Sequence, residues 1–153
     1  TFIVKQQNED FYLLDVIGGT ENAVIHPSKP IVAYSCGCII IVHNLFTDEK
    51  LQLSDQQHEI KSLKFSAAGS GSLHTEGDYL ISIDLNTQKN QANIKIWNWS
   101  SGFCIQTSPL PSSGILLESE KKFNCGFDHS GSLFCVLETT LACYRASVWS
   151  FNR

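Results

Sequence analysis

The sequence predicts an all-β protein, and three observations support that prediction. Its apolar runs are short, rich in β-branched and aromatic residues, and separated by clusters of Gly, Pro, Asn, Asp and Ser, which is typical of strands joined by turns. No segment has the apolar periodicity of a helix. The 153 residues are 42% hydrophobic and 17% charged, as in a globular protein that can bury a core.

The expected strands follow one another at short intervals along the whole chain. In order, they are residues 12–17, 22–26, 31–35, 38–44, 60–65, 79–83, 93–98, 104–107, 123–127, 133–137 and 145–151. A continuous apolar run such as 38–42 indicates a strand that is buried on both faces. The sequence therefore predicts sheets that pack against other sheets.

These strands fall into three similar units, at 23–45, 60–99 and 123–151. Each unit consists of a strand, a tight polar turn, a second strand, a short loop, and a third strand that ends in an aromatic residue or His followed by a polar residue. The closing pairs are His43-Asn44, Trp97-Asn98 and Trp149-Ser150. Self-similarity at a period of roughly 40 residues predicts radially arrayed four-stranded sheets, the blades of a β-propeller.

The units resemble WD repeats, whose second strand follows a turn of the Ser-Pro-Asp-Gly kind and whose third strand closes on Trp-Asp. The pairs at 97–98 and 149–150 stand in the closing positions, and the pair at 43–44 is a weaker counterpart. His58-Glu59 resembles the Gly-His that opens a repeat. No unit has Trp-Asp itself, and we expect the family's His, Ser/Thr, Asp and Trp hydrogen-bond set to be incomplete in every unit. The resemblance implies blades at 20–55, 56–108 and 115–153, with 1–18 as the end of a preceding blade.

Three blades do not close a ring, so the resemblance also implies further blades. Both faces of a blade pack against its neighbours, and an isolated slice would leave apolar faces bare. The chain has no Met, even at position 1, which indicates that it begins inside a longer protein. We expect large aromatic side chains to pack between blades. These packing residues are Phe65, Trp97, Phe127 and Trp149.

The function implied by the resemblance is that of a non-catalytic scaffold for protein–protein interaction. The first unit, with His-Pro-Ser-Lys at 26–29 and Gly-Cys-x-Ile-x-Val at 37–42, is most similar to propellers of cytoskeletal, ciliary and kinase-binding scaffolds. This likeness implies protein partners and a cytoplasmic location, in a microtubule-linked or ciliary assembly. Loops 67–76 and 108–119 interrupt the repeat spacing, and each is a candidate for recognition or for a neutral insertion.

Charge and hydropathy argue against two classes of partner. The net charge is −4, and the Lys and Arg residues are scattered rather than clustered, so we expect no nucleic-acid partner. The longest apolar run, 38–42, is far shorter than the roughly 18 residues that indicate a membrane span. We therefore expect no membrane partner.

The cysteines and histidines form no recognisable metal or nucleophilic motif. The six cysteines are Cys36, Cys38, Cys104, Cys125, Cys135 and Cys143, and all but Cys104 lie in or beside apolar runs. We expect them to be reduced and buried as small hydrophobic side chains. Cys36, Cys38 and His43 are near one another in sequence but lack the Cys-x-x-Cys spacing of zinc sites. None of the five histidines accompanies a nucleophile motif; they are His26, His43, His58, His74 and His129.

Other chemical motifs are also missing from the sequence. Gly18-Gly19 lacks the glycine spacing, the Lys and the following helix of a phosphate-binding loop. The acidic residues that we considered are dispersed in polar turns, and none forms a glycosidase-like pair; they are Asp10, Glu49, Asp55, Glu118 and Glu120. We nominate no catalytic, cofactor-binding or metal-binding residue and expect no cofactor.

Two alternatives remain open from the sequence. The first is a propeller enzyme with active residues on the innermost strands, but residues 23–25, 60–65 and 123–127 offer little ionisable chemistry. The second is a self-contained β-sandwich of three uneven Greek-key units, which would be a soluble monomer by itself. A propeller slice is instead expected to self-associate.

Overall fold

The computed structural model of the chain describes residues 22–53, 58–67, 77–111, 121–128, 130–140 and 144–150. Within these ranges the chain forms eleven strands and no helix, which confirms the all-β prediction. The described part accordingly contains no helix that could cross a lipid bilayer.

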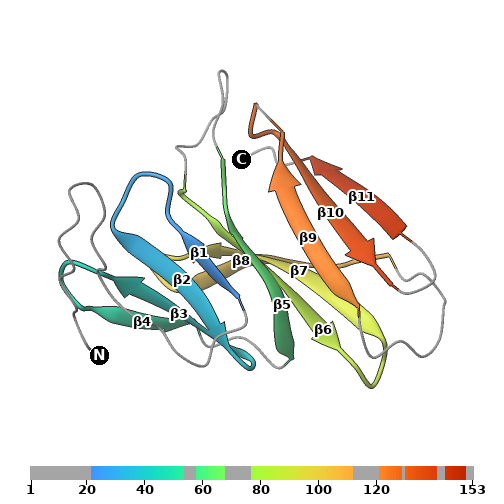
Figure 1. Cartoon of the computed structure of the whole chain (residues 1–153), viewed down its shortest axis with the longest axis horizontal. Helices are drawn as coiled ribbons and strands as arrows, with labels where there is room; N and C mark the ends of the chain where they lie inside the picture. Colours follow the sequence, from blue (N-terminus) through green and yellow to red (C-terminus); the bar gives the residue numbers. More distant parts are fainter. Residues whose placement is uncertain are drawn as a thin grey trace, which may run out of the picture.

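The strands form three antiparallel sheets in chain order (Figure 1). Sheet 1 contains β1 (Ala23–Ile25), β2 (Ile31–Cys36), β3 (Ile39–Asn44) and β4 (Lys50–Leu53). Sheet 2 contains β5 (Glu59–Phe65), β6 (Leu80–Asn86), β7 (Gln91–Asn98) and β8 (Phe103–Pro109). Sheet 3 contains β9 (Lys122–Phe127), β10 (Leu133–Thr139) and β11 (Tyr144–Ser150). Within each sheet every strand pairs with the next one, so these are three simple meanders rather than the two sheets of a Greek-key sandwich.

Every predicted strand that falls within the described residues coincides with an observed strand, with its ends shifted by a few positions. The predicted strand at 12–17 lies outside the described residues. β4 was not predicted, because Lys50-Leu51-Gln52-Leu53 alternates over only four residues. Residues 108 and 109 were expected in a loop, whereas both belong to β8 and pair with β7.

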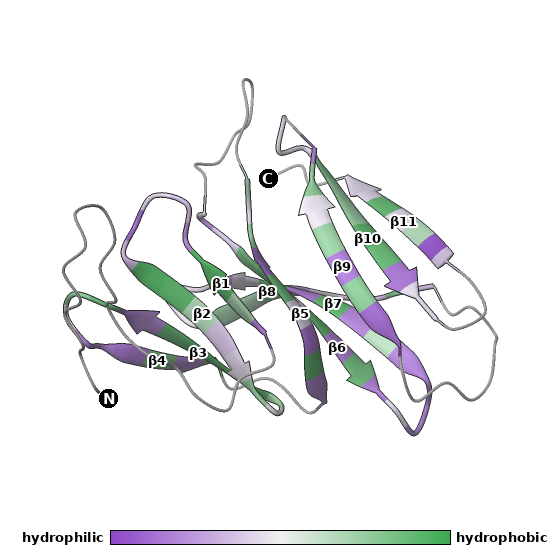
Figure 2. Ribbon diagram, viewed as in Figure 1, coloured by the Kyte–Doolittle hydropathy of each residue, from purple (hydrophilic) through white to green (hydrophobic). Residues whose placement is uncertain are grey.

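The first strands of the three sheets lie side by side. β5 contacts β1 and β2 of sheet 1 and also contacts β9 of sheet 3, and Figure 1 shows β5 running between them. Sheet 2 therefore lies between the other two sheets. Figure 2 shows hydrophobic residues along strands of all three sheets, most clearly on β2 and β10.

Two apolar clusters join the sheets face to face. The cluster between sheets 1 and 2 consists of Ile31, Ala33, Ile40, Val42, Leu53, Ile60, Leu63, Phe65, Leu80 and Trp97. The cluster between sheets 2 and 3 consists of Ile81, Ile83, Leu85, Ala92, Ile94, Leu110, Phe123, Phe134 and Val136, with Phe127 and Trp149 packed against it. The prediction that four aromatic residues pack between the units is confirmed, and the Trp97 side chain is completely buried.

The two closing tryptophans differ in their hydrogen bonding. The Trp97 indole N–H donates to the Ser82 hydroxyl, with 2.9 Å between Nε1 and Oγ. Trp97 stands opposite Leu80, and Ser82 lies two residues further along β6. In sheet 3, Trp149 stands opposite Phe134 in the same way, so Val136 occupies the place of Ser82. Among the described residues the buried Trp149 Nε1 has no hydrogen-bond partner, because the valine at this position offers no acceptor.

One face of sheet 3 packs on sheet 2, and the opposite face is open. On this outer face the side chains of Leu133, Leu137, Tyr144 and Val148 are exposed, Val148 by 66% and Tyr144 by 79%. Cys135 lies on the same face, directly opposite Val148 in the register. Exposed apolar residues gathered on one sheet face mark a surface suited to further packing.

The prediction that the cysteines are buried is wrong for three of the described ones. Cys36 and Cys38 are exposed because they flank Gly37, which has a φ of +61° in the β2–β3 turn. Cys135 is exposed on the outer face of sheet 3. Cys125 lies on the covered face, where burial raises the pKa of its thiol despite a contact with the hydroxyl of Ser62. Cys104 is partly buried, and Cys143 lies outside the described residues.

Candidate functional site

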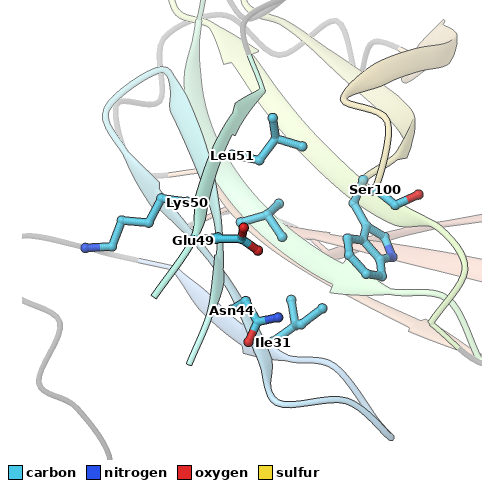
Figure 3. Close-up of a pocket in the computed structure, with 8 residues that line it drawn as sticks. Ile31, Asn44, Glu49, Lys50, Leu51 and Ser100 are labelled. Atoms are coloured by element: carbon cyan, nitrogen blue, oxygen red, sulfur yellow. The ribbon is translucent and has the colours of Figure 1, made fainter. Parts of the chain in front are cut away.

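The candidate site is an open hollow of about 210 Å³ where the edges of sheets 1 and 2 meet (Figure 3). It is formed by the start of β2, the end of β3, β4, and the turn that follows β7. The lining residues are Ile31, Val42, Asn44, Glu49, Lys50, Leu51, Trp99 and Ser100.

The apolar walls of the hollow belong mainly to sheet 1. Ile31 and Val42 are buried, and Leu51 on β4 is 39% exposed. The Leu51 methyl groups also lie against the turn of sheet 2, since a Cβ placed on Gly102 would be 3.7 Å from the nearer one. Leu51 therefore bridges the two sheets at the edge of the hollow.

The β3–β4 turn positions an acidic side chain in the hollow. The Asn44 side-chain oxygen accepts hydrogen bonds from the backbone N–H groups of residues 46 and 47, which fixes the turn. The Thr47 hydroxyl then donates to Glu49 Oε2 at 3.0 Å. In Figure 3 the Glu49 carboxylate points into the hollow between Ile31 and Leu51.

A buried histidine completes the same turn. His43 Nε2 lies 2.8 Å from Asp48 Oδ1, and Asp48 has a φ of +60°. This left-handed conformation is unusual for a residue with a side chain, although Asp tolerates it better than most. The contact between His43 and Asp48 therefore holds the turn that carries Glu49.

Trp99 forms the wall on the side of sheet 2. Its indole N–H donates to the Gly77 carbonyl, with Nε1 and O only 2.6 Å apart. The rings of His26 and Phe65 meet it edge to face, at centroid distances of 5.5 and 6.2 Å. The Lys29 ammonium lies 5.2 Å from the centre of the Trp99 ring. These contacts fix the indole before any ligand binds.

His26 connects this aromatic group to sheet 1. Its Nδ1 accepts hydrogen bonds from the backbone N–H groups of Ser28 and Lys29, each at 3.1 Å. The imidazole packs against Phe65 at 5.0 Å between ring centroids. These contacts give His26 a structural role in the junction between the sheets.

Cys36, Cys38 and His43 lie near one another in sequence, but the fold does not bring them together as one group. His43 pairs with Val32 near the start of β2, whereas Cys36 pairs with Ile39 at the opposite end of the hairpin. Among the described residues, no group of three His, Cys, Asp or Glu side chains is arranged to hold a metal ion. The structure thus separates the residues that lie near one another in sequence.

Of the acidic residues, histidines and loops named from the sequence, only some lie within the described residues. Of the five acidic residues, Glu49 lines the hollow, while Asp10, Asp55, Glu118 and Glu120 lie outside the described residues. His58 is partly buried just before β5, and His74 and His129 lie outside the described residues, as do Gly18 and Gly19. Of loops 67–76 and 108–119, the structure describes only residues 67 and 108–111.

The hollow itself was not predicted from the sequence. Its walls come from positions 31, 42, 51 and 99, which no local pattern links. The one available signal was that Trp99 follows Trp97 by two residues, so strand periodicity directs both side chains to the face covered by sheet 1. In the comparisons with known proteins, no protein-family model and no curated protein matches the chain.

Proposed function

We propose that the chain contributes consecutive blades to a WD-repeat β-propeller and acts as a non-catalytic scaffold that binds other proteins. The observation that carries this proposal is the stacking of three meanders with β1, β5 and β9 side by side. Blades arranged around a central axis require their first strands to be neighbours and their faces to be joined by apolar side chains. The two clusters on either side of sheet 2 supply those contacts.

The bond between Trp97 and Ser82 supports the WD-repeat part of the proposal. The family's hydrogen-bond set contains a Trp, which closes the third strand, and a Ser or Thr. Trp97 on β7 and Ser82 on β6 form this bond at 2.9 Å. This bond corresponds to one part of that set.

The open face of sheet 3 supports the presence of further blades. Sheets 1 and 2 have four strands, whereas sheet 3 has three in the described part of the chain. Its outer face carries exposed Leu, Val and Tyr side chains in the pattern that the inner faces use for packing. A further sheet on this face would bury them.

The likeness of the first unit to cytoskeletal, ciliary and kinase-binding scaffolds suggests the setting, a cytoplasmic assembly linked to microtubules or cilia. The partners would be other proteins, together with the remaining blades. No observation in the described ranges favours the enzymatic alternative.

Thiol labelling tests the proposal, because cysteines lie on different faces of sheet 3. We would alkylate the native 153-residue chain with N-ethylmaleimide and quantify each cysteine by peptide mass spectrometry. The same experiment would use a version extended by the flanking sequence of its parent protein. Cys135 on the outer face should react quickly in the short chain. In the extended chain its reaction rate should be lower by a factor of about ten or more, because the thiol would react only after local opening.

Three other cysteines serve as internal controls. Cys36 and Cys38 are exposed in a turn and should react equally in both versions. Cys125, on the covered face, should react slowly in both because its thiol is desolvated. Equal labelling of Cys135 in both versions, with the extended protein folded and monomeric, would refute a further blade on this face.

A further inference from the structure

We propose that the hollow between sheets 1 and 2 binds a basic side chain, Lys or Arg, presented by a partner protein. This inference rests on the proposed function insofar as the ligand belongs to a protein. The residues that line the hollow within the described ranges come from sheets 1 and 2, so the hollow does not require a further sheet on sheet 3.

The walls suit the long stem of a basic side chain. Ile31, Val42 and Leu51 form an apolar surface beside the hollow. Lys and Arg bury their methylene groups against such surfaces while they keep the charged end in a polar environment. A short or fully polar side chain would leave these walls in contact with water.

Glu49 supplies the charge that a basic group needs. The Thr47 hydroxyl donates a hydrogen bond to Glu49 Oε2 and so orients the carboxylate, which leaves Oε1 available to a ligand. No described Lys, Arg or His forms an ion pair with Glu49. The net charge of −4 adds a favourable long-range attraction for a cationic partner.

Trp99 provides the second group that recognises a cation. A Trp ring attracts Lys and Arg within about 6 Å of its centre, and the approach of Lys29 to 5.2 Å indicates that this ring accepts a cation. Lys29 does not line the hollow and therefore does not block it. The bond to Gly77 and the contact with His26 fix the ring in advance, which reduces the entropy cost of binding.

Other ligands fit this hollow less well. An acidic side chain would meet the Glu49 carboxylate, and a purely apolar one would desolvate it without compensation. Lys50 also lines the hollow, but in Figure 3 its ammonium extends away from Glu49 and Leu51. The combination of apolar walls, one carboxylate and one Trp therefore selects a basic group.

The three tryptophans give a direct readout, since each has one indole N–H signal in the ¹H–¹⁵N spectrum. We would titrate the 153-residue chain with the blocked peptide Ala-Ala-Arg-Ala-Ala and follow these signals, assigning the relevant one with Trp99→Phe. Because one exposed ion pair contributes little, we expect a dissociation constant on the order of 1 mM. The Trp99 signal should shift saturably, while those of buried Trp97 and of Trp149 stay unchanged.

Matched peptides and variants distinguish recognition of the charge from nonspecific binding. A peptide with citrulline in place of Arg keeps the shape but has no charge, and a Glu peptide reverses the charge. Glu49→Gln should weaken Arg-peptide binding about threefold to fivefold. Glu59→Gln is the control, because it makes the same charge change at a residue that pairs with Lys61 at 2.9 Å and lies outside the hollow.

Any of four results would overturn the inference. These are equal binding of the citrulline and Arg peptides, equal effects of the Glu49 and Glu59 substitutions, parallel shifts of all three indole signals, and no saturable shift by about 10 mM peptide. The labelling of Cys135 reports on the open face of sheet 3 and not on this hollow. The failure of the blade proposal and the failure of the basic-ligand proposal are therefore distinguishable.

Discussion

Gly77→Ala is the sharpest test of the junction between sheets 1 and 2. Gly77 has a φ of +78°, and a Cβ placed on it would lie 2.3 Å from His26 Nε2. Gly102 also has a φ of +78°, but its nearest neighbour would be a Leu51 methyl at 3.7 Å, an ordinary contact. The two Ala substitutions therefore carry the same backbone strain and differ in the collision with His26.

The collision cannot be relieved cheaply, because His26 is held on several sides. Its Nδ1 accepts hydrogen bonds from Ser28 and Lys29, and its ring packs against Phe65 and Trp99. The left-handed backbone should cost Ala about 1–2 kcal/mol at either glycine. Overpacking a fixed ring should add about 1–3 kcal/mol. We expect Gly102→Ala to lose about 1–2 kcal/mol of unfolding free energy and Gly77→Ala to lose about 2–5 kcal/mol.

Urea unfolding of the 153-residue chain, followed by circular dichroism, measures both losses. The comparison requires that the unfolding free energy depends on urea concentration with the same slope in the variants and the unsubstituted chain. A rescue variant tests the cause. In a His26→Ala background, Gly77→Ala should cost only the backbone strain, so the two substitutions should be strongly non-additive. Equal losses for the two glycines, or additive effects with His26→Ala, would refute this account of the junction.

The remaining predictions concern single side chains in sheets 2 and 3. Ser82→Ala should lower the unfolding free energy by about 1–3 kcal/mol, because it leaves the buried Trp97 N–H without an acceptor; a loss within error would contradict this. Val136→Thr should be neutral or stabilising in the same assay, because its hydroxyl would stand where the Trp149 indole N–H finds no acceptor in the described part of the chain, whereas an ordinary buried hydroxyl would cost about 1–3 kcal/mol. Hydrogen bonds from a neighbouring Ser side chain and from backbone N–H groups lower the pKa of Asp128 from its ordinary 3.8. The Asp128 carboxylate should therefore stabilise the β9–β10 turn fully above about pH 3.8, and this stabilisation should disappear as the pH falls through the lower pKa of the folded state. An NMR titration that gives Asp128 a pKa of 3.8 or higher would disprove this expectation.

The strands and their grouping could be predicted from the sequence because both depend on local information. Alternation, β-branched residues and turn-forming residues act within a few positions, and all three units carry them strongly. β4 was not predicted because its four residues are too few to establish an alternating pattern. The exposure of Cys135 was not predicted for a different reason. The sequence pattern of a strand does not reveal which face of the strand another sheet covers.

The hollow could not be predicted, because its chemistry depends on contacts between distant residues. Glu49 looked like one of several dispersed acidic residues, and only the turn fixed by Asn44 and Thr47 directs it toward Ile31. Trp99 looked like a neighbour of the closing pair. Its orientation depends on Gly77, which is 22 positions away in the chain.

The three closing pairs show how one sheet pattern is retained with different chemistry. Trp97 fills the cluster between sheets 1 and 2 and bonds to Ser82. Trp149 takes the same register position in sheet 3 and contributes by burial against the second cluster. His43 in sheet 1 is buried and contacts Asp48 in the adjacent turn. Each sheet thus places a buried or partly buried ring near the end of its third strand, and the polar contacts of that ring differ from sheet to sheet.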